Sequence, residues 1–138
     1  MVEFYSENDF ELLMKDELSK WIGEVVQKEN CELGEVGYVF CNDDFLLRIN
    51  QDFLNHDTYT DIITFDYNLG NQINSEIYIS TERVKENAEE FGVTLEDELH
   101  RVMIHGILHL CGYGDKTEEE KTTMRKRENE ALEARQFV

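Results

Sequence analysis

The feature that most constrains the fold is a segment at residues 95–111 that, as a helix, is apolar on almost every face. Thr94 offers an N-cap with Asp97 three residues later, and Gly112 is suited to end the helix. A helix that is apolar all round is normally buried, so we expect this one to lie inside the protein. Its apolar residues are Leu99, Val102, Met103, Ile104, Ile107, Leu108, Leu110 and Cys111.

The rest of the chain alternates between strand and helix patterns. Strands rich in β-branched and aromatic residues are predicted at residues 2–7, 35–42, 62–68 and 74–80. The turn-prone sequence NLGNQ joins the last two into a hairpin. Further helices are predicted at residues 8–30, with Asn8 as the N-cap, at 44–54, at 81–92, and from the capping box at Thr117 onward. This order predicts an α/β (α+β) fold with a mixed, roughly four-stranded sheet covered by helices.

Two histidines, His105 and His109, interrupt the apolar helix, and their spacing puts both rings on one side, one turn apart. Gly112 and Gly114 allow the chain to turn back and bring Asp115 to the same face. The resulting pattern, His-x3-His-x5-Asp, offers two nitrogens and one oxygen and leaves one position open, as in a catalytic zinc site. The alternative is a histidine pair that is satisfied by structural hydrogen bonds.

Gly106 excludes one familiar use of such a site. In HExxH metallopeptidases the residue after the first histidine is a glutamate that acts as general base. Glycine has no side chain, so that route to peptide hydrolysis is not available here. The nucleophile, a metal-bound water, has to be activated by the metal or by a carboxylate from elsewhere.

Composition limits the remaining classes. The 138 residues suit one domain, and no apolar run is long enough for a membrane span. Three cysteines without a CxxC pair indicate reduced thiols in a cytoplasmic protein. The net charge of −18 argues against a general nucleic-acid binder. Residues 121–138, with five basic and three acidic side chains, are the first candidate for phosphate contact, and a locally paired helix face is the alternative.

With these residues in view, the chain resembles the YbeY family of bacterial ribosomal RNA maturation factors. Residues 105–115, HGILHLCGYGD, resemble the family hallmark H-G-x-x-H-L-x-G-Y-x-H. Residues 59–65, YTDIITF, resemble its P-T-D-V-L-S-F block, and residues 75–77, SEI, its G-D-I. Met124 and Glu128 in the last helix also fit the family.

The resemblance implies a single metal-dependent hydrolase domain, residues 1–138, with a zincin-like metal-binding helix. It implies a zinc-dependent endoribonuclease, with one Zn²⁺ per chain, that hydrolyses RNA phosphodiesters in small-subunit ribosomal RNA 3′-end maturation and ribosome quality control. Ribosomal RNA, the small ribosomal subunit and basic ribosomal proteins are the implied partners. It also implies His105 and His109 as two of the three metal ligands.

The chain departs from the family pattern at two places. The third ligand is a histidine in most of the family and Asp115 here. A carboxylate lowers the charge of the site, which makes the bound water a weaker acid and harder divalent metals more competitive. The family also often has a basic residue before the Thr-Asp block, where this chain has none. His56 is a candidate donor or proton carrier in its place, and an ordinary loop histidine is the alternative.

Several other residues have two interpretations each. Thr60 and Asp61 favour turn chemistry, with a contact to a metal-binding histidine as the second possibility. Arg101 and Lys116 flank the histidine segment and are candidates to hold a phosphate, against ordinary salt bridging. Basic residues of the last helix are substrate-binding candidates for the same reason, namely Lys121 and Arg125.

Three function classes follow. The first is a single-strand-selective endoribonuclease in ribosomal RNA processing. The second is a non-catalytic, metal-stabilised ribosome assembly factor, which the acidic surface suits because ribosomal proteins are basic. The third is a metal-dependent hydrolase of another substrate, including peptides, which Gly106 disfavours.

Overall fold

A computed structural model describes residues 1–56 and 58–138, which form four strands and five helices. The strands are β1 (Val2–Ser6), β2 (Glu32–Cys41), β3 (Ile62–Asp66) and β4 (Gln72–Ser80). The helices are α1 (Lys15–Lys28), α2 (Asp43–Leu54), α3 (Thr81–Phe91), α4 (Leu95–Leu110) and α5 (Glu118–Glu133). The order of elements is the one expected from the sequence.

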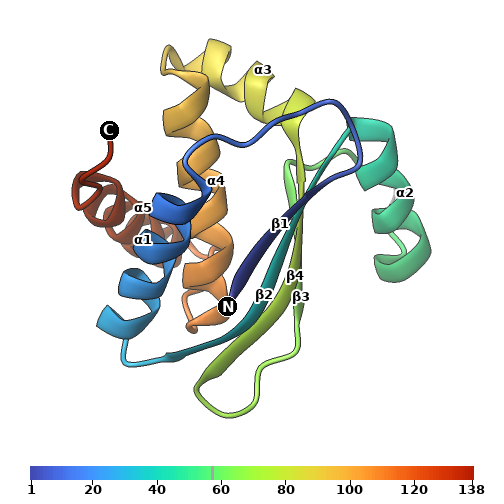
Figure 1. Ribbon diagram of the computed structural model, residues 1–138. Coiled ribbons are helices and arrows are strands. Elements are labelled where there is room, and N and C mark those ends of the chain that lie inside the picture. The colour runs from blue at the N-terminus through green and yellow to red at the C-terminus, as the bar shows by residue number, and fades with distance from the viewer. Residues whose placement is uncertain (57) are drawn as a thin grey trace.

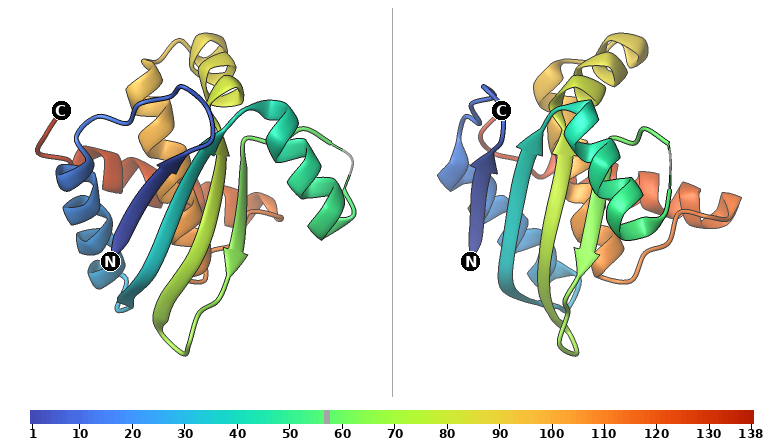
Figure 2. Two further views of the ribbon diagram at one scale, coloured as in Figure 1. Left: turned by 45° about the vertical axis from the view of Figure 1, so that its right-hand side comes forward. Right: turned by 90° about the vertical axis from the view of Figure 1, so that its right-hand side faces the viewer.

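The strands form a single mixed sheet in the order β1-β2-β4-β3, which Figure 2 shows side by side in its right-hand view. β1, β2 and β4 run parallel, and β3 pairs antiparallel with β4 through the predicted hairpin. Gly70 has φ 61 in the hairpin turn, a conformation that glycine adopts without strain. The predicted mixed, four-stranded sheet is therefore confirmed.

Helices cover the sheet unequally. Figure 1 shows α1, α4 and α5 on one side of it and α2 on the other. On the first side, Tyr38 and Phe40 of β2 and Ile77 of β4 pack with α1 and α4 in the main core. On the second side, α2 covers a smaller cluster around Leu46 and Ile63. Period-two alternation along the strands explains why one sheet supplies both cores.

The central helix α4 is buried over most of its length, as its composition predicts. At Gly106 the helix approaches β3 and β4 closely. A Cβ atom added there would lie 3.1 Å from Ile62 Cδ1, 3.4 Å from Thr64 Oγ1 and 3.5 Å from Ile77 Cδ1. The two histidines of this buried helix both line a cavity. His105 is half-buried, whereas His109 is exposed at the last turn.

The start of the first helix was predicted wrongly. The helix begins at Lys15 rather than after Asn8, and its N-cap residue Met14 has φ 63. The Asn8 amide nitrogen instead donates to Asn42 Oδ1 and Thr81 Oγ1, each at 2.9 Å. Asn8 thus ties the incoming chain to the starts of α2 and α3. Among the described residues, no helix is long and apolar enough to cross a membrane.

Candidate metal centre

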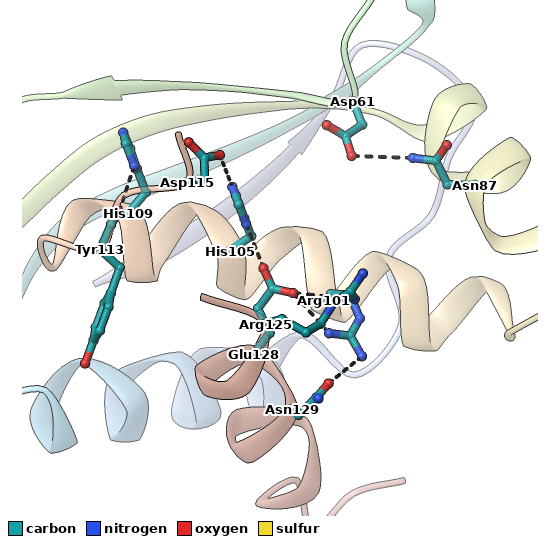
Figure 3. Close-up of polar contacts among 10 residues, drawn as sticks. All are labelled: Asp61, Asn87, Arg101, His105, His109, Tyr113, Asp115, Arg125, Glu128 and Asn129. Carbon is teal, nitrogen blue, oxygen red and sulfur yellow. Dashed lines mark hydrogen bonds and ion pairs between the residues drawn. The ribbon is translucent and has the colours of Figure 1, made fainter. Parts of the chain in front are cut away.

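His105 lies between two carboxylates (Figure 3). Its Nδ1 is 2.7 Å from Glu128 Oε2 on α5, and its Nε2 is 3.4 Å from Asp115 Oδ2 in the loop after α4. A ring that donates its Nδ1 hydrogen to a carboxylate keeps a lone pair on Nε2, which is the arrangement that metal-ligating histidines use. The Glu128 hydrogen bond raises the pKa of His105 above its ordinary value, against the effect of burial.

Glu128 is the buried centre of this arrangement. Its Oε1 accepts a hydrogen bond from Arg101 Nη1 at 3.0 Å, and Arg101 Nη2 donates to Asn129 Oδ1 at 2.9 Å. Burial works to raise the pKa of the Glu128 carboxyl, but the hydrogen bonds from His105 and Arg101 outweigh it and hold that pKa below its usual range. Arg101 is thus committed to Glu128 and acts on the site through it.

The sequence interpretation gave Glu128 no role in the site. The available signal was its position on the buried stripe of α5, which also carries Met124 and Ala131. A carboxylate among apolar positions at helical spacing is seldom buried without a partner. Its partner lies 23 residues away on another helix, so the spacing within α5 did not identify it.

His109 is held differently. Its Nδ1 lies 3.1 Å from the carbonyl oxygen of Tyr113, in the loop that Gly112 opens with φ 111. The hydroxyl of Tyr113 donates to Glu29 Oε2 at 2.6 Å, which fixes the loop against the end of α1. Donation from Nδ1 to the carbonyl likewise leaves the Nε2 lone pair of His109 free.

The three expected ligands line one cavity of about 490 Å³, here called the histidine cavity, whose lining includes His56, Thr60, Asp61, His105, His109, Asp115 and Lys116. His105 and Asp115 are in contact, and His109 joins them in the lining without touching them in this arrangement. In the described part of the chain, no three His, Cys, Asp or Glu side chains are close enough to hold a metal ion. The donor chemistry nevertheless fits a metal, because both imidazoles have Nδ1 engaged and Nε2 available.

A second cavity of about 450 Å³ shares Asp61, His105 and Asp115 with the first. We call it the Glu98 cavity, because Glu98 of α4 lines it, together with Asn87, Phe91, Arg101, Lys121, Arg125 and Glu128. The structure therefore brings the predicted cations Arg101, Lys121 and Arg125 to one side of His105. Lys116 and His56 are on the side of the histidine cavity.

Thr60 and Asp61, just before β3, contact both their own segment and neighbouring elements. Thr60 Oγ1 donates to the carbonyl of Ile62 at 3.4 Å, and the Asp61 carbonyl accepts from Ser80 N at 2.9 Å. The Asp61 carboxylate lies 3.5 Å from Asn87 Nδ2 (Figure 3), and burial raises its pKa above the usual value. Asp61 lies in the walls of both cavities and reaches His105 only through its electrostatic field.

Comparison with known proteins decides the family. A family model described as Endoribonuclease YbeY matches residues 3–136 of the chain. The chain belongs to the YbeY family. The resemblance seen in residues 59–65 and 105–115 is thereby confirmed for nearly the whole sequence.

Individual relatives agree with the YbeY match. A protein of Flavobacterium psychrophilum named Endoribonuclease YbeY is 52% identical over 96% of this chain and 94% of its own length. A protein of the same name from Christiangramia forsetii is 50% identical over 95% of this chain and 92% of its own. The solution structure of TM1509 from Thermotoga maritima matches with a TM-score of 0.72 and 32% identity, over 96% of this chain and 87% of that one. The fold is therefore that of a solved protein.

Proposed function

We propose that this chain is a metal-dependent, single-strand-selective endoribonuclease that acts in ribosomal RNA processing, including small-subunit 3′-end maturation and ribosome quality control. The names of the YbeY relatives support cleavage of RNA. The observation that carries the proposal is the pair of histidines on α4, each with Nδ1 engaged by an oxygen, in the wall of one cavity. We infer one hydrolase domain over residues 1–138, acting in the cytoplasm.

We propose His105, His109 and Asp115 as the ligands of one Zn²⁺ per chain. A zinc ion would supply polarisation of the scissile phosphate and a lowered pKa for its water. Because Asp115 is a carboxylate, other divalent metals compete at this site. Glu128 orients His105, and Arg101 in turn holds Glu128 in place.

Positive side chains around the two cavities are the proposed RNA contacts. Lys116 lines the histidine cavity, while Lys121 and Arg125 line the Glu98 cavity. They supply local positive charge on a chain whose net charge is −18, so the RNA would meet a small cationic patch. His56, in the lining of the histidine cavity, is placed to accept or donate a proton there. Ribosomal RNA, the small ribosomal subunit and basic ribosomal proteins are the proposed partners.

Metal content tests the ligand set. Wild-type protein purified without chelators is expected to hold one zinc ion, and Asp115→Ala is expected to bind it with a lower affinity, measured by competition with a chromophoric chelator. Asp52→Ala, which removes an exposed carboxylate from α2, is the matched control and is expected to keep wild-type affinity. Full affinity in Asp115→Ala would remove Asp115 from the ligand set.

RNA cleavage tests the activity. The purified protein is expected to cut single-stranded RNA, and His109→Ala is expected to abolish cutting, because the exposed His109 contributes little to the core. Undiminished cleavage by a folded His109→Ala protein would trace the activity to a contaminant. Ribosome association that persists in His105→Ala, without any cleavage by the wild type, would favour the assembly factor. Gly106 argues against the peptidase, because it has no side chain to act as the general base of an HExxH site.

A further inference from the structure

Glu98 is a buried charged side chain of α4 that the proposed chemistry does not use. It lies in the first turn of the helix, with only 5% of its surface exposed, and it lines the Glu98 cavity. Among the described residues it has no hydrogen-bond or ion-pair partner for its carboxyl group. Burial raises the pKa of this carboxyl, and the nearby Asp61 raises it further. Its carboxyl oxygens are open to the cavity, where they are available as acceptors for the N–H groups of a bound molecule.

The rest of the cavity lining is aromatic, amide or cationic, in contrast to the carboxyl group of Glu98. The Phe91 ring is exposed to it, and Asn87 contributes an amide group beside Asp61. Lys121 and Arg125 are 57% and 58% exposed, against 5% for Glu98, so the cations lie at the rim and the acceptor lies deep. An aromatic face, deep acceptors and rim cations together match a nucleotide, whose base carries N–H donors and whose phosphate is anionic.

We propose that the Glu98 cavity binds one base of the RNA substrate, with guanine preferred, and that Lys121 and Arg125 hold the adjoining phosphate beside His105. Guanine presents two neighbouring donors, N1–H and N2–H, which match the two oxygens of one carboxylate. Adenine and cytosine present an amino group next to an acceptor, and uracil presents one N–H between two carbonyls. The inference rests on the proposed nuclease function, because it assigns the sequence preference of that same site.

A divalent cation is the other ligand that carboxylates attract. Cation sites of this kind use several oxygen ligands in a defined cage. The described residues around Glu98 supply no group of three side chains able to form one, and three cations line the same cavity. The charge pattern therefore favours a base with its phosphate over a metal ion.

Nucleotide binding tests the proposal directly. Metal-free protein is titrated with the 5′-monophosphates of guanosine, adenosine, cytidine and uridine in a calorimeter. The guanosine nucleotide is expected to bind about tenfold more tightly than the others, because a bidentate pair discriminates by that order. Glu98→Gln is expected to lose this preference, because an amide offers one acceptor and one donor.

Glu96→Gln is the matched control. Glu96 is exposed in the same turn of α4, so both variants remove one negative charge from the same helix end, yet only Glu98 faces the cavity. Glu96→Gln is expected to keep the tenfold preference. Phe91→Ala, at an exposed position that leaves the core intact, is expected to weaken all four nucleotides together.

The outcomes separate the base site from the nuclease. Equal binding of all four nucleotides, or a guanosine preference that survives Glu98→Gln, overturns the base site. Manganese binding by wild type that Glu98→Gln abolishes would assign the cavity to a cation and also overturn it. If the wild type shows the preference but cuts no RNA, the base site stands and the proposed function fails. If the wild type cuts RNA but shows no nucleotide preference, the proposed function stands and the base site fails.

Discussion

Two histidines of α4 have opposite surroundings although both are largely withdrawn from solvent. His105 contacts the carboxylates of Glu128 and Asp115. His100 is 4% exposed, packs against the rings of Trp21 and Phe137, and accepts a hydrogen bond at Nδ1 from Arg135 Nη1 at 2.7 Å. Burial and the Arg135 charge lower the pKa of His100 to about 4. An apolar helix can therefore carry a histidine for packing alone, and the charge of its partner distinguishes that histidine from a candidate ligand.

The largest expected effect separates these two residues by activity. His105→Gln is expected to lower single-turnover RNA cleavage by at least about a thousandfold, the scale for removing part of a catalytic unit. His100→Gln is expected to stay within about threefold of wild type at a temperature where it is folded, because the amide oxygen still accepts from Arg135. Equal losses in the two variants would mean that position on α4, and not ligation, sets the activity.

Removing the carboxylate behind His105 has the next largest effect. Glu128→Gln is expected to weaken zinc affinity by about 10- to 100-fold, as for other groups that orient a ligating histidine. It is also expected to lower the free energy of unfolding of metal-free protein by about 2 kcal/mol, because Arg101 loses its charged partner. Glu130→Gln, in the same helix and paired with the half-buried Arg127, is the control, with a loss below about 1 kcal/mol. Chelator competition and urea unfolding measure the two quantities.

The dependence of the unfolding free energy on pH below 6.5 reports on His100. Its folded pKa of about 4 lies below the ordinary 6.5, so the unfolded chain takes up a proton in this window and the folded protein does not. The stability of metal-free protein is therefore expected to fall as the pH drops from 6.5 towards 4, with at most about 3 kcal/mol from this residue. His100→Gln is expected to flatten that part of a profile of unfolding free energy against pH. An unchanged profile would contradict a neutral buried His100.

The dependence of the unfolding free energy on pH above 6.5 reports on His105, whose pKa is raised in the folded protein. The stabilisation from its charged form is complete below pH 6.5 and is lost as the pH rises through the folded pKa. Metal-free protein is therefore expected to lose stability above pH 6.5, and Glu128→Gln is expected to remove this loss. Zinc should bind more weakly below the raised pKa, since a proton competes for the same ring. Differential scanning calorimetry across pH 5–9 with chelator present separates the His105 effect above pH 6.5 from the His100 effect below it.

The smallest expected effect concerns the loop carbonyl that holds His109. Tyr113→Phe removes the hydroxyl group that donates to Glu29, at an expected cost of about 1 kcal/mol in unfolding free energy. Zinc affinity is expected to change less than in Glu128→Gln, because the carbonyl of residue 113 remains. A larger loss of zinc affinity in Tyr113→Phe would show that the loop anchor matters more than the buried carboxylate.

Most of the fold was predictable because its signals are local. The side chains of Thr94 and Thr117 each accept the expected cap hydrogen bond, Ser80 caps α3 in the same way, and the hairpin forms at NLGNQ. The start of α1 was not predictable in this way, because Asn8 uses its side chain on two distant segments. The placement of β4 between β2 and β3 likewise depends on packing across the whole chain.

In the candidate site, too, the residues placed by local spacing were predictable and those placed by packing between helices were not. The spacing of His105 and His109 on one helix is a local property, and the structure places both in one cavity wall. Asp115 approaches His105 after the turn at Gly112, whose φ of 111 is a conformation that favours glycine. Glu128 and Arg101 meet His105 only because α5 packs on α4, a contact that no spacing within either helix encodes.

Gly106 has a consequence for how this scaffold can evolve. A single substitution to glutamate would complete the HExxH sequence, yet any side chain there has to enter the space already filled by Ile62, Thr64 and Ile77. Acquiring the peptidase base would require these three side chains to give way beside the helix that carries His105 and His109. The route from this nuclease scaffold to a peptidase therefore begins with enlarging the hairpin face, and only later with the catalytic residue.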